Sequence, residues 1–191
     1  MEIGALHERT VREWTRLVDG VGDDQWDLAT PCTDWSVRDL VNHVVGEELW
    51  TVPLVRGSTI AEVGSQFDGD VLGDDPVGRA HHAADEAVAA VKDAPADGTV
   101  HLSYGEERLD EYLSQLAADH LVHGWDLAKA TGQDATLDPE LVADVSGWFV
   151  EREELYRAAG VVGERVADAG PDPQSQLIAA SGRDPGWSAL D

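Results

Sequence analysis

Apolar residues in this chain recur at three- and four-residue steps, and this helical spacing limits the fold more than any other feature. In the first segment the apolar positions form one stripe of a helix that ends near Gly20 or Gly22. The stripe consists of Ile3, Leu6, Thr10, Trp14, Leu17 and Val21. No segment shows convincing alternation of apolar and polar residues, which marks a half-buried strand. The spacing therefore predicts an all-α protein.

Capping signals divide the helical pattern into separate elements. Ser36 followed by Asp39 has the form of a capping box, and the dipeptides Asp75-Pro76 and Asp138-Pro139 each place a helix-capping Asp before a Pro. Residues 58–73 should form a loop with at most one short helix. Beyond the first helix, we expect helices at about 36–56, 76–92 and 106–130, and a fifth that begins at Pro139.

Two glycine- and proline-rich stretches separate or follow these helices. Pro95–Gly105 is expected to be a connector that is extended, if anywhere, at Thr99–Leu102. After Gly160 the chain holds one short apolar piece, SQLIAA. The pattern predicts an antiparallel helix bundle over residues 1–160, and a C-terminal extension or strap, residues 161–191, that packs on the bundle.

The charge balance excludes two classes of partner. Thirteen Lys and Arg residues stand against 38 Asp and Glu residues, which gives a formal net charge of −25. A field of this sign repels phosphate backbones and anionic lipid surfaces, and no basic cluster offsets it. We therefore expect neither a nucleic-acid partner nor a membrane partner.

The single cysteine, Cys32, excludes a disulfide within the chain. The first ten residues, MEIGALHERT, resemble no secretory leader, and no apolar run approaches the length of a membrane span. These features predict a cytoplasmic protein. Cys32 itself reads either as a nucleophile or as a small buried hydrophobic residue, and the absence of a basic residue paired with it favours the second interpretation.

The stretch DHLVHGWDL holds the most informative polar residues. Asp119 and His123 are four residues apart, so on a helix their side chains point within about 40° of each other, one turn apart. This spacing allows both to reach one divalent cation, although it also suits a surface ion pair. His120 lies nearest the centre of the apolar face and is either a rival ligand or a hydrogen-bonded core imidazole.

Three segments together resemble a known family. TPCTDWSVRDLVNHVVG, ADHLVHGWDLAKATGQD and QSQLIAASGRDPGW occur in the order found in the mycothiol-dependent, maleylpyruvate isomerase-like family of actinobacteria, within the DinB-like superfamily. The resemblance implies a DinB-like four-helix bundle that binds a divalent metal, most often Zn²⁺. Carried over by position, the implied ligands are His43, Asp119 and His123. The family's isomerase has a glutamate as acidic ligand, so Asp119 is shorter by one methylene and His120 stays open as a rival.

The resemblance also implies a reaction class. We expect mycothiol or another low-molecular-weight thiol as cosubstrate of an isomerase or S-transferase that acts on a small electrophile. The family's isomerase carries a full second domain, whereas this sequence is closer to short members that end in a GRDP motif, so maleylpyruvate is not the expected substrate. The alternative is a non-catalytic metal- or small-molecule-binding protein of the same fold. Either form is expected to be a monomer or homodimer.

Two further residues are candidates for roles around the site. Asp126 lies on the same side of the helix as Asp119 and either accepts the ring N–H of a ligand histidine or is a capping or surface carboxylate. Arg183, in the GRDP motif, either meets an anionic group on a ligand or pairs with one of the many carboxylates. Trp35 and Trp125 are expected to form core or pocket walls.

Overall fold

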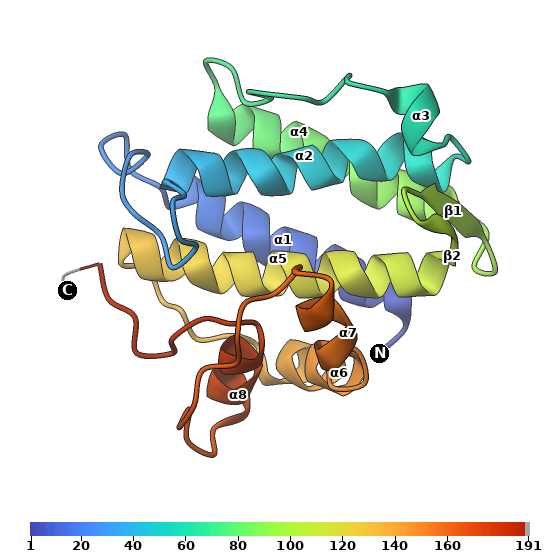
Figure 1. The fold of residues 1–191 in the computed structure, drawn as a ribbon. Helices are drawn as coiled ribbons and strands as arrows, with labels where there is room; N and C mark the ends of the chain where they lie inside the picture. Colours follow the sequence, from blue (N-terminus) through green and yellow to red (C-terminus); the bar gives the residue numbers. More distant parts are fainter. Residues whose placement is uncertain (190–191) are drawn as a thin grey trace. The chain divides into compact units, whose positions relative to one another are not determined.

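The computed structural model describes residues 1–189, which form eight helices and one two-stranded hairpin (Figure 1). In chain order they are α1 (Ile3–Asp19), α2 (Val37–Val55), α3 (Ile60–Val63), α4 (Pro76–Asp93), β1 (Thr99–Leu102), β2 (Gly105–Arg108), α5 (Leu109–Thr131), α6 (Pro139–Phe149), α7 (Glu153–Ala158) and α8 (Pro173–Ala180). The expected all-α class is confirmed, with the small hairpin as its one addition in this part of the chain.

The chain divides into two compact units. The first consists of Met1–Asp19 and Val41–His120, and the second of Gly20–Leu40 and the chain from Leu121 onward. Two of the three boundaries fall inside helices, so α2 and α5 each contribute to both units. The predicted division at residue 160 stays a prediction, and the last two residues of the predicted extension, 190–191, lie outside the described residues.

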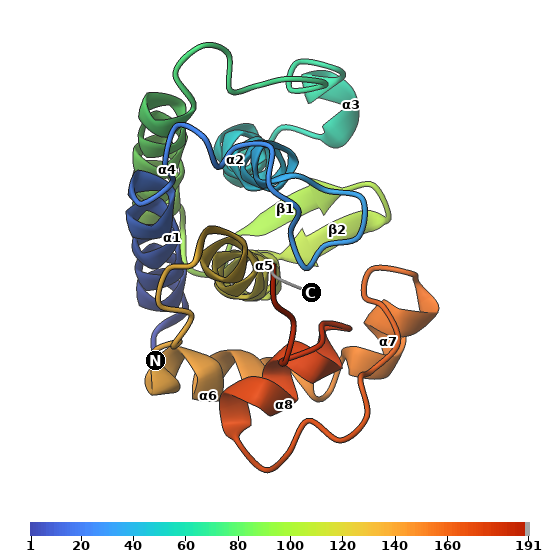
Figure 2. The ribbon, with the colours of Figure 1, turned by 90° about the vertical axis from the view of Figure 1, so that its left-hand side faces the viewer.

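The four long helices of the predicted bundle, α1, α2, α4 and α5, supply the first unit. α1 and α4 pack side by side (Figure 2). Their buried contact is formed by Val11, Ala84 and Val88. At the exposed edge of this contact, Arg12 Nη1 donates to Asp85 Oδ1 at 2.6 Å. The alanine-rich face of α4 allows the close approach, because small side chains let two helix backbones come near each other.

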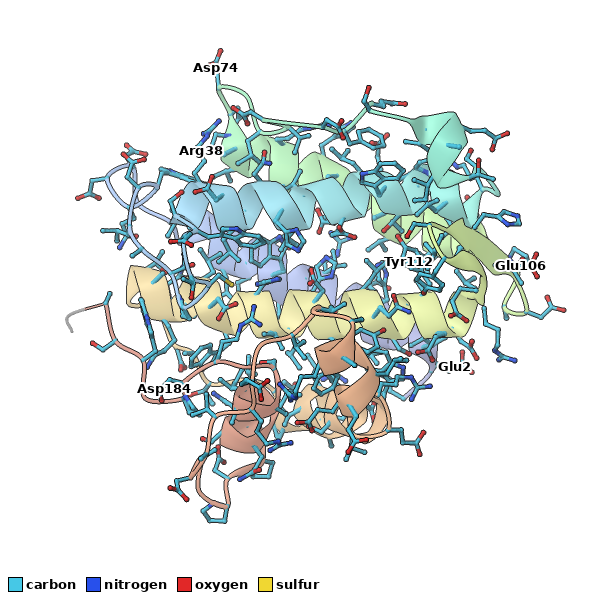
Figure 3. The ribbon with its side chains drawn as sticks, viewed as in Figure 1. Glu2, Arg38, Asp74, Glu106, Tyr112 and Asp184 are labelled. Carbon is cyan, nitrogen blue, oxygen red and sulfur yellow. The ribbon has the colours of Figure 1, made fainter. Side chains whose placement is uncertain are left out.

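A second cluster of apolar side chains fills the end of the first unit near the hairpin. Its buried members are Leu54, Val91, Val100, Leu109, Tyr112, Leu113 and Leu116. Tyr112 points from α5 toward α2 (Figure 3), where its hydroxyl lies 3.3 Å from Thr51 Oγ1. The hydrogen bond satisfies two buried hydroxyl groups, which would otherwise destabilise the core.

The hairpin corrects one predicted boundary. Thr99–Leu102 is extended as expected, but the helix predicted to start near Glu106 begins at Leu109. Residues 105–108 instead pair antiparallel with β1, from Thr99 opposite Arg108 to Leu102 opposite Gly105. Gly105 has a φ of +135°, which L side chains rarely adopt, and this glycine lets the chain reverse into β2.

The predicted helix starts are confirmed where a side chain caps the helix. Ser36 N donates to Asp39 Oδ2 at 2.9 Å and Asp39 N donates to Ser36 Oγ at 3.1 Å, which is the reciprocal capping box. Asp75 Oδ1 accepts from Gly78 N at 2.9 Å. Asp138 caps α6 in the same way. These caps fix where α2, α4 and α6 begin.

In the second unit, α6 and α8 pack together, and α8 contains the apolar piece SQLIAA. Leu137 N donates to Gln174 Oε1, and Gln174 Nε2 donates to Ala135 O, each at 2.8 Å. One glutamine side chain thus ties the segment before α6 to the first turn of α8. No helix within residues 1–189 combines the length and apolar character that crossing a membrane requires. The cytoplasmic location stays a prediction.

Candidate functional site

α5 carries four candidate residues on successive turns. Asp119 and His120 lie on one turn, and His123 and Asp126 follow on the next turns. The helix is continuous over 23 residues, so Asp119 and His123 lie one turn apart on it, as their spacing predicted. The boundary between the two units falls directly after His120. His43 and Asp119 belong to the first unit, and His123 and Asp126 to the second.

His43 lies beside Asp119 in the first unit. Its Nε2 is 3.5 Å from Asp119 Oδ2, and the two side chains are 31% and 29% exposed. His43 is therefore half-buried against a carboxylate, which is the environment of an ion pair or of two ligands that share a cation.

His120 is buried in the first unit with a partner at each ring nitrogen. Nδ1 donates to Leu116 O at 2.6 Å, because a carbonyl oxygen can only accept. Nε2 lies 3.2 Å from Oε1 of Glu48, and neither side chain is exposed. Burial by itself lowers the pKa of His120, but the hydrogen bond and charge of Glu48 outweigh it and raise that pKa. As a metal ligand, His120 would have to give up one of these partners.

His7 completes this buried group from α1. Its ring meets the ring of His120 edge-on, with centroids 6.1 Å apart and an interplanar angle of 78°. Neither ring nitrogen of His7 has a hydrogen-bond partner among residues 1–189. Burial, and then the charge of His120, lowers the pKa of His7 from 6.5 to about 3. His7 is therefore a neutral imidazole at physiological pH.

In the second unit, His123 is held by Asp126 and Trp35. Its Nδ1 lies 2.9 Å from Asp126 Oδ2, and its ring lies 5.8 Å from the ring of Trp35 with a tilt of 30°. When Nδ1 carries the proton for this bond, the lone pair of the ring is on Nε2, at the opposite edge. The arrangement is the one in which a carboxylate orients a metal-binding histidine.

Arg183 reaches the same carboxylate from the turn after α8. Its Nη2 donates to Asp126 Oδ2 at 3.2 Å and to Cys32 Sγ at 3.1 Å. The predicted alternative for Arg183, pairing with a carboxylate, is confirmed. Burial alone would raise the pKa of Asp126, but the hydrogen bond from His123 and the charge of Arg183 bring it below its ordinary value.

Cys32 sits in a tight loop of the second unit, before α2. The loop closes through backbone bonds from Thr30 N to Trp35 O at 3.2 Å and from Trp35 N to Cys32 O at 3.1 Å. This closure directs the thiol to Asp126, whose Oδ2 accepts from Sγ at 3.2 Å. Cys32 therefore has polar partners and is more than the small hydrophobic residue that the sequence suggested.

Cys32, His123 and Asp126 also form a set of potential metal ligands. One donor atom from each lies within 4.8 Å of the others, and sulfur, nitrogen and oxygen are donors that zinc accepts. However, the guanidinium of Arg183 already contacts both Cys32 Sγ and Asp126 Oδ2. A metal among these atoms would meet a fixed positive charge at hydrogen-bond distance. The geometry favours an orienting role for this set.

Sequence reasoning missed the partners that come from distant segments. Glu48 gave no signal, because a single glutamate in a helix is normally solvated. Its 0% exposure and its contact with His120, which is 72 residues away, both depend on the assembled fold. The pairing of Cys32 with Arg183 spans 151 residues, and no local pattern marks it.

Comparison with known proteins agrees with the fold. The sequence profile described as the mycothiol maleylpyruvate isomerase N-terminal domain matches residues 7–128. Two uncharacterized proteins of Mycobacterium tuberculosis, one from strain CDC 1551 and one from strain H37Rv, are each 32% identical over 195 residues. Each match covers 93% of this chain and 95% of the relative.

A solved structure has the same fold at low sequence identity. It is the crystal structure of a histidine-to-alanine mutant of the mycothiol-dependent maleylpyruvate isomerase, with a TM-score of 0.61 and 13% identity. The match covers 90% of this chain and 72% of that chain. The profile match spans more than half of the sequence and includes α2, α4 and most of α1 and α5. The chain therefore belongs to the mycothiol maleylpyruvate isomerase N-terminal domain family.

Proposed function

We propose that His43, Asp119 and His123 bind a divalent cation, and that zinc is the metal this set suits best. The observation that carries the proposal is the contact between His43 and Asp119, with Nε2 and Oδ2 3.5 Å apart. Helix continuity places His123 one turn after Asp119 on α5. Two imidazoles and one carboxylate form a common ligand set of catalytic zinc.

The chemistry of the three residues fits a cation. Asp119 supplies the negative charge, and its contact with His43 brings a nitrogen and an oxygen donor to one place. Asp126 accepts from His123 Nδ1, which puts the lone pair of the ring on Nε2. Three protein ligands leave at least one coordination position for another molecule, which is the difference between catalytic and structural zinc sites.

The family and its solved relative support a low-molecular-weight thiol, such as mycothiol, as cosubstrate. A bound divalent cation would stabilise the thiolate form of that thiol at neutral pH. The partial exposure of His43 and Asp119 gives a small molecule access to these two side chains. Trp35, beside the ring of His123, supplies an apolar surface.

The proposed reaction class is an isomerase or S-transferase that acts on a small electrophile. A thiolate would add to an activated double bond and leave a carbanion. Rotation about the new single bond and loss of the thiolate would give cis–trans isomerisation, whereas protonation of the carbanion would leave the thiol group bonded to the product. The chain's own residues would hold and orient the reactants, because nucleophile and electrophile react faster when they are kept in contact. Maleylpyruvate itself is not part of the proposal.

Metal analysis of untagged protein, purified without chelators, tests the proposed site. We expect stoichiometric divalent metal in the wild type and its loss in His43→Ala, His123→Ala and Asp119→Asn. His82→Ala is the matched control, because His82 is an exposed histidine that faces a carboxylate, with Nε2 3.4 Å from Glu86 Oε2. Wild-type protein without metal, also after incubation with zinc, would refute the proposal.

Thiol binding tests the proposed cosubstrate. We expect saturable binding of mycothiol to the metal-loaded protein, measured by calorimetry, and its loss after chelation or in His43→Ala. Turnover of small electrophiles with mycothiol then separates the enzyme from the alternative function. Tight metal binding without turnover of any electrophile would favour a non-catalytic binding protein of the same fold.

A further inference from the structure

Three sequence motifs meet at one carboxylate oxygen in the second unit. Asp126 Oδ2 accepts from His123 Nδ1 at 2.9 Å, from Cys32 Sγ at 3.2 Å and from Arg183 Nη2 at 3.2 Å. Cys32 comes from the TPC segment, His123 and Asp126 from HGWD, and Arg183 from GRDP. The metal site proposed above uses only the histidine among them.

These bonds fix the orientation of the Asp126 side chain. The carboxylate is fully buried, so water cannot replace a lost protein donor without a change of structure. Arg183 contributes twice, since its Nε also lies 3.3 Å from Oδ2. A charged donor attracts a carboxylate more strongly than a neutral donor at the same distance does. The guanidinium is therefore the strongest restraint on Asp126 apart from His123 itself.

The turn after α8 holds the side chain and backbone of Arg183 in place. Arg183 Nη1 donates to Ser181 O at 2.8 Å, and Arg183 N donates to Ile178 O at 3.1 Å. Gly182 has a φ of +84°, and a Cβ added there would lie 2.8 Å from the Cα of Gly163. Only glycine fits this position without a shift, so the turn presents the guanidinium in one direction.

We propose that Arg183 is a positioning residue for His123. It fixes Asp126, and Asp126 keeps the proton of His123 on Nδ1, so that Nε2 carries the lone pair that a cation requires. The inference rests on the proposed metal site and deepens it, because it assigns a task to the C-terminal GRDP motif. Cys32 supports the same carboxylate as a weaker, neutral donor.

The contacts of Arg183 argue against the other predicted role, recognition of an anionic substrate. Its Nε and Nη2 donate to Asp126, Nη2 also donates to Cys32, and Nη1 donates to Ser181 O. Its side chain is only 16% exposed. A substrate anion would have to displace Asp126, which would release His123.

The test compares Arg183→Gln with Arg165→Gln. Arg165 is the matched control because it also pairs with a carboxylate of the second unit, Glu153 at 2.7 Å. The first readout is the tautomer of His123 in the metal-free protein, from ¹⁵N NMR. We expect Nδ1–H in the wild type and in Arg165→Gln, and a mixture of tautomers in Arg183→Gln. The second is zinc affinity, which should fall about tenfold in Arg183→Gln only.

Each outcome decides the proposal. An unchanged tautomer together with wild-type zinc affinity in Arg183→Gln would overturn it. If the wild type itself binds no zinc, the proposed function fails, and the NMR comparison still decides whether Arg183 positions His123. If Arg183→Gln does not fold, Arg183→Lys is measured by the same readouts, because lysine keeps the charge but loses the planar fork.

Discussion

Replacement of His7 with leucine should stabilise the protein, and the gain should grow as the pH falls. His7 is 1% exposed, and neither of its ring nitrogens has a hydrogen-bond partner within the described chain. An unsatisfied buried polar group destabilises a fold by about 1–3 kcal/mol. Leucine has a similar volume and brings no polar atom, so it removes this penalty at every pH.

The dependence on pH comes from the pKa of His7, which the fold lowers from 6.5 to about 3. The folded state keeps the imidazole neutral, while the unfolded chain takes up a proton below pH 6.5. Stability is therefore lost as the pH falls from 6.5 toward 3, and the loss levels off below the folded pKa. At about 1.4 kcal/mol per pKa unit, the loss is about 2 kcal/mol at pH 5 and about 5 kcal/mol at its limit.

Urea unfolding at about pH 7.5 and about pH 5 measures this effect. The free energy of unfolding of His7→Leu minus that of the wild type should increase by about 2 kcal/mol between the two conditions. His82→Gln is the control, because it removes a histidine that is largely exposed instead of buried. If the difference for His7→Leu is the same at both pH values, His7 binds a proton as readily in the folded protein as in the unfolded chain. That result would refute the reasoning.

Two further predictions concern stability. Glu48→Leu leaves Nε2 of the buried His120 without its partner at 3.2 Å and should destabilise the protein by about 3 kcal/mol in urea unfolding. Glu48→Gln, which can keep a hydrogen bond, should cost less, and equal losses would contradict this account. Ser36→Ala removes the cap of α2 and should lower stability by about 1 kcal/mol, whereas Ser36→Gly should cost only a few tenths. Equal losses in the two Ser36 variants would contradict the capping role.

Much of the fold could be predicted from the sequence because its signals are local. The caps at Ser36, Asp75 and Asp138 mark helix starts within one turn of sequence. The second strand could not be predicted, since GEER has neither β-branched residues nor an apolar face. It forms because the turn at Gly105 brings it back along β1. Its pairing is therefore a property of the hairpin as a whole.

The candidate site also combines features that local spacing predicts with contacts that depend on the assembled fold. The spacing of Asp119 and His123 is a local property of a helix, so it could be read directly from the sequence. The environment of His43 could not, because its half-burial beside Asp119 depends on the approach of another helix. Asp126 was proposed as an orienting carboxylate, but its contact with Cys32 joins residues 94 positions apart. Contacts at that separation depend on the assembled fold.

The two histidines of α5 show why burial and ring orientation decide what spacing leaves open. His120 donates Nδ1 to Leu116 O and faces Glu48 with Nε2, so both edges of its ring are engaged in a fully buried pair. His123 uses Nδ1 for Asp126, which puts its lone pair on Nε2. A cation would replace a partner of His120, whereas Asp126 keeps the lone pair of His123 on Nε2, the atom that would face a cation. This contrast supports the proposal that His123 is the ligand and His120 a core residue.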